Sequence, residues 1–260
     1  MSKYFRVWLL LSFASFQSFF VSRIGAFLFL VGKILRFIFF ALFLIFLISK
    51  TKVLAGYNLW QVMLFYLTFN FIDSTTQMLF REVYRFRQQV ISGNFDLVLV
   101  KPVNSLFRSL FGWTDILDFI TLIPFIIMII FVISKIPEIT SLGIVFYIVL
   151  VVNALLIATS FHIIVLALAI LTTEIDHAIM IYRDLTGMGK IPVGIYSEPL
   201  RSFITFVVPV GIMMSYPVES LLGKLSTGAV SVAFFISLFI FSLSMILWNY
   251  AVKSYTSASS

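Results

Sequence analysis

Long runs of apolar residues constrain this chain more than any other feature of its sequence. A helix that crosses a bilayer needs about 20 mostly apolar residues, because every backbone N–H and C=O group must be satisfied within the segment. Five runs in the 260-residue chain reach or approach that length: residues 27–48, 59–80, 116–134, 142–171 and 229–250. Hydrophobic residues make up 61% of the chain and charged residues only 11%, which excludes a water-soluble globule. The sequence therefore predicts an all-α membrane protein.

A sixth apolar run, residues 203–214, is too short to cross a bilayer alone and contains Pro209. Pro209 removes a helical hydrogen bond, and Pro217 follows it in the same segment. Two interpretations remain open: a span of residues 203–214 with a re-entrant turn of residues 215–223, or one kinked span. The expected architecture is a single transmembrane domain of about six helices, with a broken or re-entrant segment before the last.

Residues 3–22 precede the first span and have the pattern of an interfacial helix. Ser12, Ser15, Ser18 and Ser22 recur at helical spacing and form a weakly polar stripe beside an aromatic-rich remainder. Such a helix lies in the membrane interface rather than across the bilayer. A transmembrane span is the alternative. No small-residue cleavage pattern follows, so a removable signal peptide is not favoured.

The basic residues predict the orientation, since cytoplasmic loops of membrane proteins carry an excess of Lys and Arg. With the N-terminus inside and six spans, all but four of the 18 basic residues fall on the cytoplasmic side, among them Arg183, Lys190 and Arg201. Those left outside are Lys50, Lys52, Lys135 and Lys224. Both termini and the loop of residues 81–108 are then cytoplasmic in a protein of the cell membrane. Anionic lipid headgroups account for the net charge of +7, so no nucleic-acid partner is implied.

The loop of residues 81–108 is the longest predicted cytosolic stretch. Its first part extends the second span as a helix, which ends at Gly93. The stretch Phe95 to Val100 is too short to cross a membrane and too apolar to lie freely in water. Either it packs against helix ends of this chain or it docks a soluble partner.

A polar stripe runs along the second span at i, i+3, i+4 and i+7. Its members are Asn70, Asp73, Ser74 and Gln77. Polar groups within the membrane face other helices or water, so this stripe is a candidate wall of a translocation path, with interhelical hydrogen bonding as the alternative. Asp115 and Asp118, at the start of the third span, are predicted to mark the membrane interface.

No catalytic, cofactor-binding or metal-binding residues are predicted. Cysteine is absent, and the two histidines, His162 and His177, have no acidic partners at ligand spacing. Glu174, Asp176 and His177 fit the solvated end of the fourth helix. No phosphate-binding GxxxxGK[ST] motif occurs, so the chain is not expected to hydrolyse nucleotides.

Three stretches together resemble one family. Residues 92–107, SGNFDLVLVKPVNSLF, have its cytosolic pattern of Gly, Asp, an aliphatic run, a basic residue and Pro. Residues 195–223 match its pre-terminal segment through Leu200, Arg201, Pro209, Tyr216, Pro217 and a closing Leu-Leu-Gly. The ending from Trp248 through Tyr255, Ser257 and Ala258 is similar as well. The family is that of type 2 ABC-exporter permeases, in the branch of small six-span proteins without a fused ATPase. The charged TTEIDH after the fourth span departs from this pattern.

The resemblance implies a permease that forms the translocation path with a second permease, identical or different. Two separate ATPase subunits, which hold ATP and magnesium, would drive it. The residues then expected to couple this chain to the ATPase are Gly93, Phe95, Asp96, Leu97, Leu99, Lys101 and Pro102. The alternative is a secondary carrier or channel for a hydrophobic or amphipathic solute.

Overall fold

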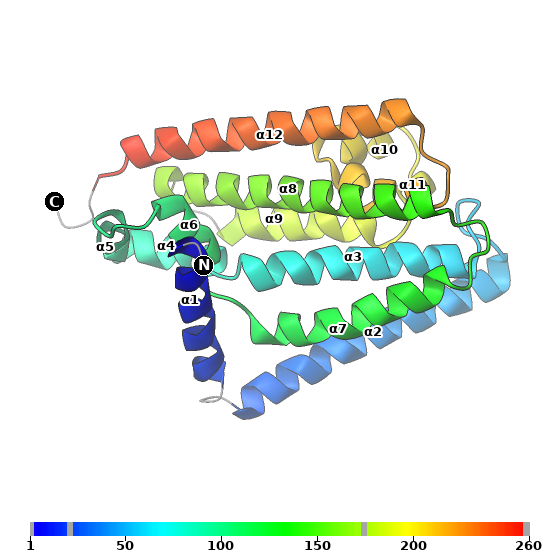
Figure 1. The fold of residues 1–260 in the computed structure, drawn as a ribbon, viewed down its shortest axis with the longest axis horizontal. Coiled ribbons are helices and arrows are strands. Elements are labelled where there is room, and N and C mark those ends of the chain that lie inside the picture. Colours follow the sequence, from blue (N-terminus) through cyan, green and yellow to red (C-terminus); the bar gives the residue numbers. More distant parts are fainter. Residues whose placement is uncertain (1–2, 20–22, 173–175, 257–260) are drawn as a thin grey trace.

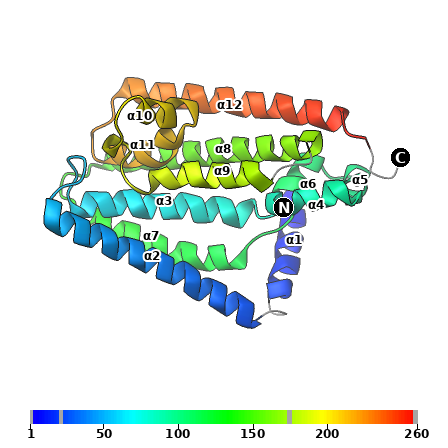
Figure 2. The same ribbon diagram turned by 180° about the vertical axis from the view of Figure 1, so that it is seen from behind.

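The computed structural model describes residues 3–19, 23–172 and 176–256. Within these ranges the regular elements are helices, apart from one isolated bridge between Leu54 and Tyr57. The prediction of an all-α protein is confirmed. Five long helices lie side by side along the molecule (Figures 1 and 2): α2 (Arg23–Thr51), α3 (Leu59–Leu79), α7 (Ile116–Ile133), α8 (Ser141–Thr172) and α12 (Thr227–Lys253).

By length and composition, four of the described helices are able to cross a membrane, namely α2, α7, α8 and α12. The number is five if a bent pair of helices before α12 counts as one span. The helix α3, which coincides with the predicted second span, is not among them because polar side chains lower its hydropathy.

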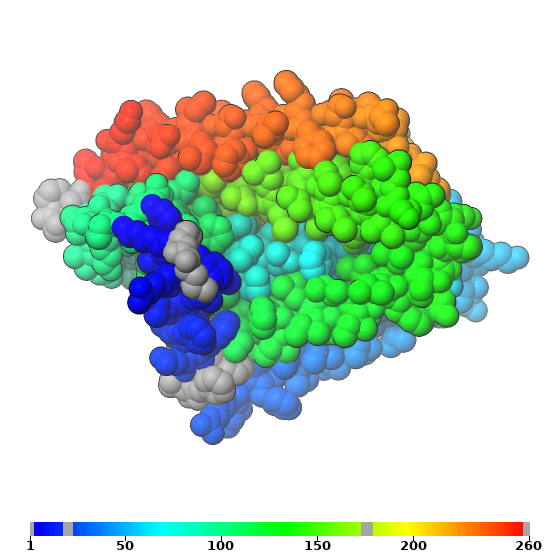
Figure 3. All heavy atoms as spheres, in the orientation of Figure 1, coloured from blue at the N-terminus to red at the C-terminus, as the bar shows by residue number. Residues whose placement is uncertain are grey.

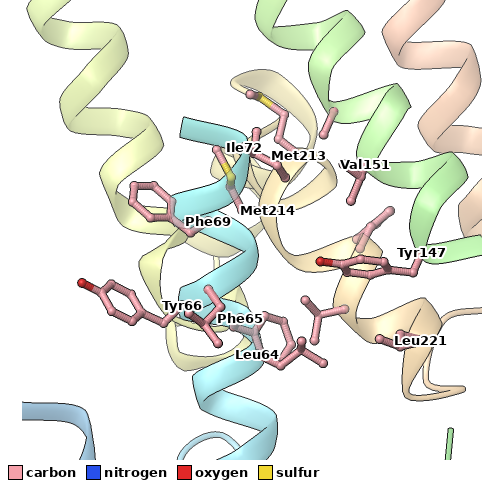
Figure 4. Packing of buried hydrophobic residues seen from close by; sticks show 14 of the residues in the cluster. Leu64, Phe65, Tyr66, Phe69, Ile72, Tyr147, Val151, Met213, Met214 and Leu221 are labelled. Atoms are coloured by element: carbon pink, nitrogen blue, oxygen red, sulfur yellow. The ribbon is translucent and has the colours of Figure 1, made fainter. Parts of the chain in front are cut away.

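The helix α3 is the central element of the bundle and packs against α2, α7 and α8. Asn58 begins it with a capping box, in which the Asn58 side chain accepts from the Gln61 backbone N–H and the Gln61 side chain accepts from the Asn58 backbone N–H. Figure 4 shows the main core, where Phe65 and Ile72 of α3 meet Tyr147 of α8 and Met213 from the bent pair. Because protein surrounds α3 on several sides, it tolerates polar residues that a lipid-facing helix would not.

The first helix, α1 (Lys3–Phe19), lies across one end of the bundle instead of along it (Figures 1 and 3). Two serines of the predicted polar stripe are buried there, and both bond to Thr114. The Ser12 and Thr114 hydroxyl oxygens are 2.7 Å apart, and the Thr114 backbone N–H donates to the Ser15 hydroxyl at 3.3 Å. The side chain of Ser18 and all of Ser22 lie outside the described residues. The direction of α1 fits the expected interfacial helix.

Three short helices form the end of the bundle at which both termini lie (Figure 1): α4 (Val83–Ile91), α5 (Asn94–Leu99) and α6 (Ser105–Phe111). The predicted continuous extension of the second span is wrong in one respect, since α3 stops at Leu79 and a turn separates it from α4. Gly93 follows α4 with a left-handed φ of 73°, which confirms it as the point where the helix ends.

After α8 the chain returns along the bundle. The helix α9 (Asp176–Gly187) runs back beside α3 (Figures 1 and 2), and the short helices η2 (Met188–Lys190) and η3 (Val193–Ile195) follow. At Gly194 the position of a Cβ atom would lie 3.9 Å from Ala55, in the loop between α2 and α3. By residue 194 the chain has therefore reached the end opposite to α4, α5 and α6.

This path differs from the predicted topology, which left Lys190 and Arg201 on the cytoplasmic side. The Lys190 ammonium lies 5.7 Å and 5.8 Å from the ring centres of Phe40 and Phe69, near the middle of α2 and α3. Arg201 belongs to α10 (Leu200–Ser202), at the end opposite to α4 (Figure 1). The sequence does not reveal this passage, because α9 is short and carries charged residues, so it leaves no apolar run.

The segment before α12 is bent, as predicted. Residues Leu200–Val207, which end in the π-helical turn η4 (Phe203–Val207), meet residues Gly211–Leu221 at 79°. The second arm consists of η5 (Gly211–Ser215) and α11 (Tyr216–Leu221). Because the chain is at the same end of the bundle before α10 and at the start of α12 (Figure 1), the pair enters and leaves from one side, as a re-entrant segment does.

Candidate functional site

The polar stripe of α3 lines a cavity of about 340 Å³ between α2, α3 and α7. All four predicted residues, Asn70, Asp73, Ser74 and Gln77, are in its wall. The Asn70 amide donates to the Tyr66 carbonyl at 2.7 Å, and the Gln77 amide donates to the Asp73 carboxylate at 2.8 Å. Both bonds stay within α3, so they do not tie the stripe to another helix. The geometry thus favours a cavity wall over interhelical hydrogen bonding for these two amides.

The opposite wall of this cavity contains an ion pair between α2 and α7. The Lys33 ammonium donates to the Asp118 carboxylate at 2.6 Å, and both side chains are largely buried. The other oxygen of Asp118 is buried, with no hydrogen-bond partner among the described residues. Asp115 has a different role, because its carboxylate caps the start of α7 by accepting from the Leu117 backbone N–H at 2.9 Å.

Asp118 lies in the first turn of α7, as predicted, and its side chain also lines the cavity, which the sequence did not predict. The signal that separates the two aspartates is their position in the helix. Asp115 precedes α7 as its N-cap, whereas Asp118 shares a helix face with Thr121, which also lines the cavity.

Positive charge gathers at one end of the cavity. A neighbouring cavity of about 420 Å³ shares Lys33, Arg36 and Gln77 with the first and adds Arg81 and Arg183 to the lining. A smaller cavity of about 80 Å³ lies between Arg36, Asp73, Arg183 and Lys190. This cluster could not be predicted from the sequence, because these cations are far apart along the chain and the predicted topology placed Arg183 and Lys190 in a cytosolic loop.

The predicted coupling residues lie on and around α5, at the end of the bundle near the termini. One face of α5 is buried, with the Phe95 ring 5.0 Å from the Phe86 ring and 5.1 Å from the Tyr255 ring. Val98 is buried in the same apolar cluster, which also contains Trp248 of α12. Burial and the neighbouring Asp96 carboxylate raise the pKa of the Tyr255 hydroxyl.

The other face of α5 is exposed. Leu97, Leu99 and Val100 have 59%, 38% and 79% of their surface accessible, and we call these three residues the apolar patch. Lys101 and Pro102 beside it are exposed as well. The sequence left two interpretations open, packing on this chain and docking of a partner. The buried face, with Phe95 and Val98, packs on helices of this chain, whereas the apolar patch on the other face is uncovered.

A buried carboxylate links the two helices that flank α5. Glu82, in the turn between α3 and α4, is 3% exposed and accepts from the Arg108 guanidinium at 3.1 Å and from the Gln89 amide at 2.5 Å. These bonds connect α4 with α6 on either side of α5. The helices on both sides of α5 are therefore linked to each other through Glu82.

The two prolines singled out in the sequence have separate positions in the bent pair. Pro209 lies at the break between its arms, and Pro217 lies in the first turn of α11, where a missing N–H costs little. Next to the break, a Cβ atom at Gly211 would lie 2.6 Å from the Thr205 hydroxyl, so only glycine fits this close approach.

The remaining polar candidates show no reactive arrangement. The Nδ1 atom of His162 is 2.7 Å from the Ala158 carbonyl within α8, as in a packing residue. Glu174 and the side chains of Asp176 and His177 lie outside the described part of the chain. Among the residues that the structure describes, no group of His, Asp and Glu is arranged to hold a metal ion.

Comparison with known proteins bears on both sites. The family model described as ABC-2 family transporter protein matches residues 33–259, a range that contains the cavity, α5 and the bent pair. No curated protein and no solved structure matches the chain.

Proposed function

Because this chain belongs to the ABC-2 family of transporter proteins, as a membrane component that lacks ATPase activity of its own, we propose that it is the permease subunit of an ATP-driven exporter. In this proposal separate ATPase subunits, which hold ATP and magnesium, bind at the end of the bundle formed by α4, α5 and α6. A second permease, identical or paralogous, completes the path across the cell membrane. Both termini then face the cytoplasm with the ATPases.

The apolar patch is the observation that carries the proposal. Leu97, Leu99 and Val100 are exposed, although α5 has a fully buried anchor in Phe95. An uncovered apolar surface on a rigid base is typical of a docking site for a protein partner. The patch also lies near Lys3 and Tyr255, which contact Pro102 and Phe95, at the end where the positive-inside pattern predicts the cytoplasm.

The cavity between α2, α3 and α7 supplies a candidate translocation path in the same proposal. It has a polar wall along α3, and the Lys33–Asp118 pair lies across from that wall. Ionisable side chains within a membrane bundle are rare and face its interior or a water-filled cavity, so they are candidates for a substrate pathway. Motion of the ATPases, transmitted through α5 and α4 to α3, would change the width of this cavity.

Purification from the native membrane tests the proposal. The full chain is isolated in mild detergent, and we expect an ATPase subunit in stoichiometric amount, with ATP hydrolysis that disappears when the subunit is stripped away. The stripped chain should hydrolyse nothing, since it has no phosphate-binding loop. ATP hydrolysis by the stripped chain, or solute transport by the chain alone in sealed vesicles, would contradict the proposal and favour a secondary carrier.

A further inference from the structure

The two larger cavities share Lys33, Arg36 and Gln77, and together they have two chemically different ends. At one end the shared residues Lys33 and Arg36 join Arg81 and Arg183, and at the other end Phe37, Phe125 and Met128 form an apolar lining. The two larger volumes, about 340 Å³ and 420 Å³, are each within the range of small-molecule pockets. A ligand that fills both must be charged at one end and apolar at the other.

The sign of the ligand's charge follows from the pairing of the cations. The Lys33 ammonium is neutralised by Asp118 at 2.6 Å, and Arg81 lies 3.5 Å from Asp115. Neither Arg36 nor Arg183 has a carboxylate within ion-pair distance in the described part of the chain. Both line the 80 Å³ and 420 Å³ cavities. Asp73 also lines the smaller one, whereas the lining of the larger one contains no carboxylate among the described residues.

The positions of the acidic residues indicate where in the cavities an anionic group would bind. Asp73 and Asp118 line the 340 Å³ cavity, and only Asp73 also reaches the small one. Within the described chain the 420 Å³ cavity is lined by four cations and no carboxylate, so an anionic group is most stable there, beside Arg36 and Arg183. Guanidinium groups bind phosphate and carboxylate oxygens in a bidentate manner, which an ammonium does not match.

We infer that these cavities bind an anionic amphiphile, with its phosphate or carboxylate headgroup between Arg36 and Arg183 and its hydrocarbon chain along Phe37, Phe125 and Met128. This inference rests on the proposed function, because it names the substrate class of the proposed translocation path. The helix α2, which supplies Arg36, is exposed along most of its length.

Direct titration tests the inference with three probes. The full chain in dodecyl maltoside is titrated calorimetrically with dodecyl phosphate, with dodecylphosphocholine and with inorganic phosphate. We expect dodecyl phosphate to bind at least 10-fold more tightly than either of the others. Equal affinity for dodecylphosphocholine would overturn the anionic headgroup, and equal affinity for inorganic phosphate would show a free-anion site and overturn the amphiphile.

Variants then locate the site. The double substitution Arg36→Gln with Arg183→Gln should weaken dodecyl phosphate binding at least 10-fold, whereas Arg36→Lys should retain part of the affinity. Lys50→Gln is the matched control, since it removes one charge from the exposed end of the same helix, and it should bind like the wild type. Unchanged binding by the double variant would overturn the assignment. If the double variant does not fold, the single Arg183→Gln variant and the three-probe comparison on the wild type decide the outcome.

The same preparations separate this inference from the proposed function. ATPase retention is measured beside the titration for each variant. Loss of amphiphile binding with full ATPase retention supports the inference alone, whereas amphiphile binding by a chain that never associates with an ATPase contradicts only the proposed function.

Discussion

The ammonium of Lys33 lies 2.6 Å from the carboxylate of Asp118, and this ion pair ties the exposed helix α2 to α7 across the cavity. The second Asp118 oxygen is buried and unsatisfied within the described part of the chain. The pair adds to the other contacts of α2 with the bundle, among them the hydrogen bond from the Tyr66 hydroxyl to the Phe37 carbonyl at 3.2 Å.

Removing one partner of this pair should be more damaging than removing both. Lys33→Met leaves the Asp118 charge buried without compensation, a change that costs about 3–5 kcal/mol in comparable buried pairs. Adding Asp118→Leu to Lys33→Met should restore much of that loss. A double-mutant cycle of thermal unfolding in detergent measures the coupling, and strictly additive effects would contradict a direct interaction.

The exposed and buried faces of α5 should respond differently to truncation. Leu97→Ala with Leu99→Ala removes apolar surface that this chain leaves exposed, so the fold should keep its stability and its place in the membrane. If a partner buries these side chains, ATPase docking should weaken by about 2 kcal/mol or more. Co-purification of the ATPase and transport in membrane vesicles measure this loss.

Phe95→Ala is the matched counterpart of that double variant. It removes a fully buried ring that contacts Phe86 and Tyr255, so it should destabilise the chain by about 3–5 kcal/mol. Normal ATPase retention and normal transport in the Leu97→Ala, Leu99→Ala variant would show that the apolar patch is not a docking surface.

Cysteine labelling tests the path of the chain. The sequence has no cysteine, so single cysteines at exposed serines give clean signals. Ser92→Cys, beside α5, should stay unlabelled by an impermeant maleimide in intact cells, whereas Ser197→Cys, before α10, should be labelled. Ser141→Cys at the start of α8 is the positive control. Protection of residue 197 would return the segment around Arg201 to the cytoplasmic side and contradict the passage through α9.

Gly93 should be required for the position of the apolar patch. Its φ of 73° is unfavourable for any residue with a Cβ atom, so Gly93→Ala should cost about 1–2 kcal/mol or turn α5 away from α4. Ser92→Ala, one residue earlier with ordinary helical angles, is the control. ATPase retention should fall in the Gly93 variant and stay normal in the control, and equal retention in both would contradict the requirement.

The sequence predicts the long helices well because a membrane span leaves a long apolar run. The run of residues 142–171 corresponds to α8, which is Ser141–Thr172, and the run of residues 229–250 lies within α12. The bend at Pro209 can also be predicted from the sequence, because a proline inside a helix removes a backbone hydrogen bond in any tertiary environment.

The features missed from the sequence depend on partners that are far away along the chain. The charged residues of α9 and η2 are compatible with a passage along the bundle because a cavity, lined also by residues of α2 and α3, receives Arg183 and Lys190. The division of α5 into a buried and an exposed face depends on Tyr255, about 160 residues after Phe95. Local pattern carries no information on either arrangement.

Both ends of the described chain contact the loop that carries the apolar patch. The Lys3 ammonium donates to the Pro102 carbonyl at 2.5 Å, and the Tyr255 ring lies 5.1 Å from the Phe95 ring. An affinity tag or fluorescent protein fused at either position would therefore stand beside the proposed docking surface and compete with a large partner. The loop between α7 and α8, near Glu138 at the opposite end of the bundle, is the better place for an inserted label, because a complex assembled on α5 would leave it accessible.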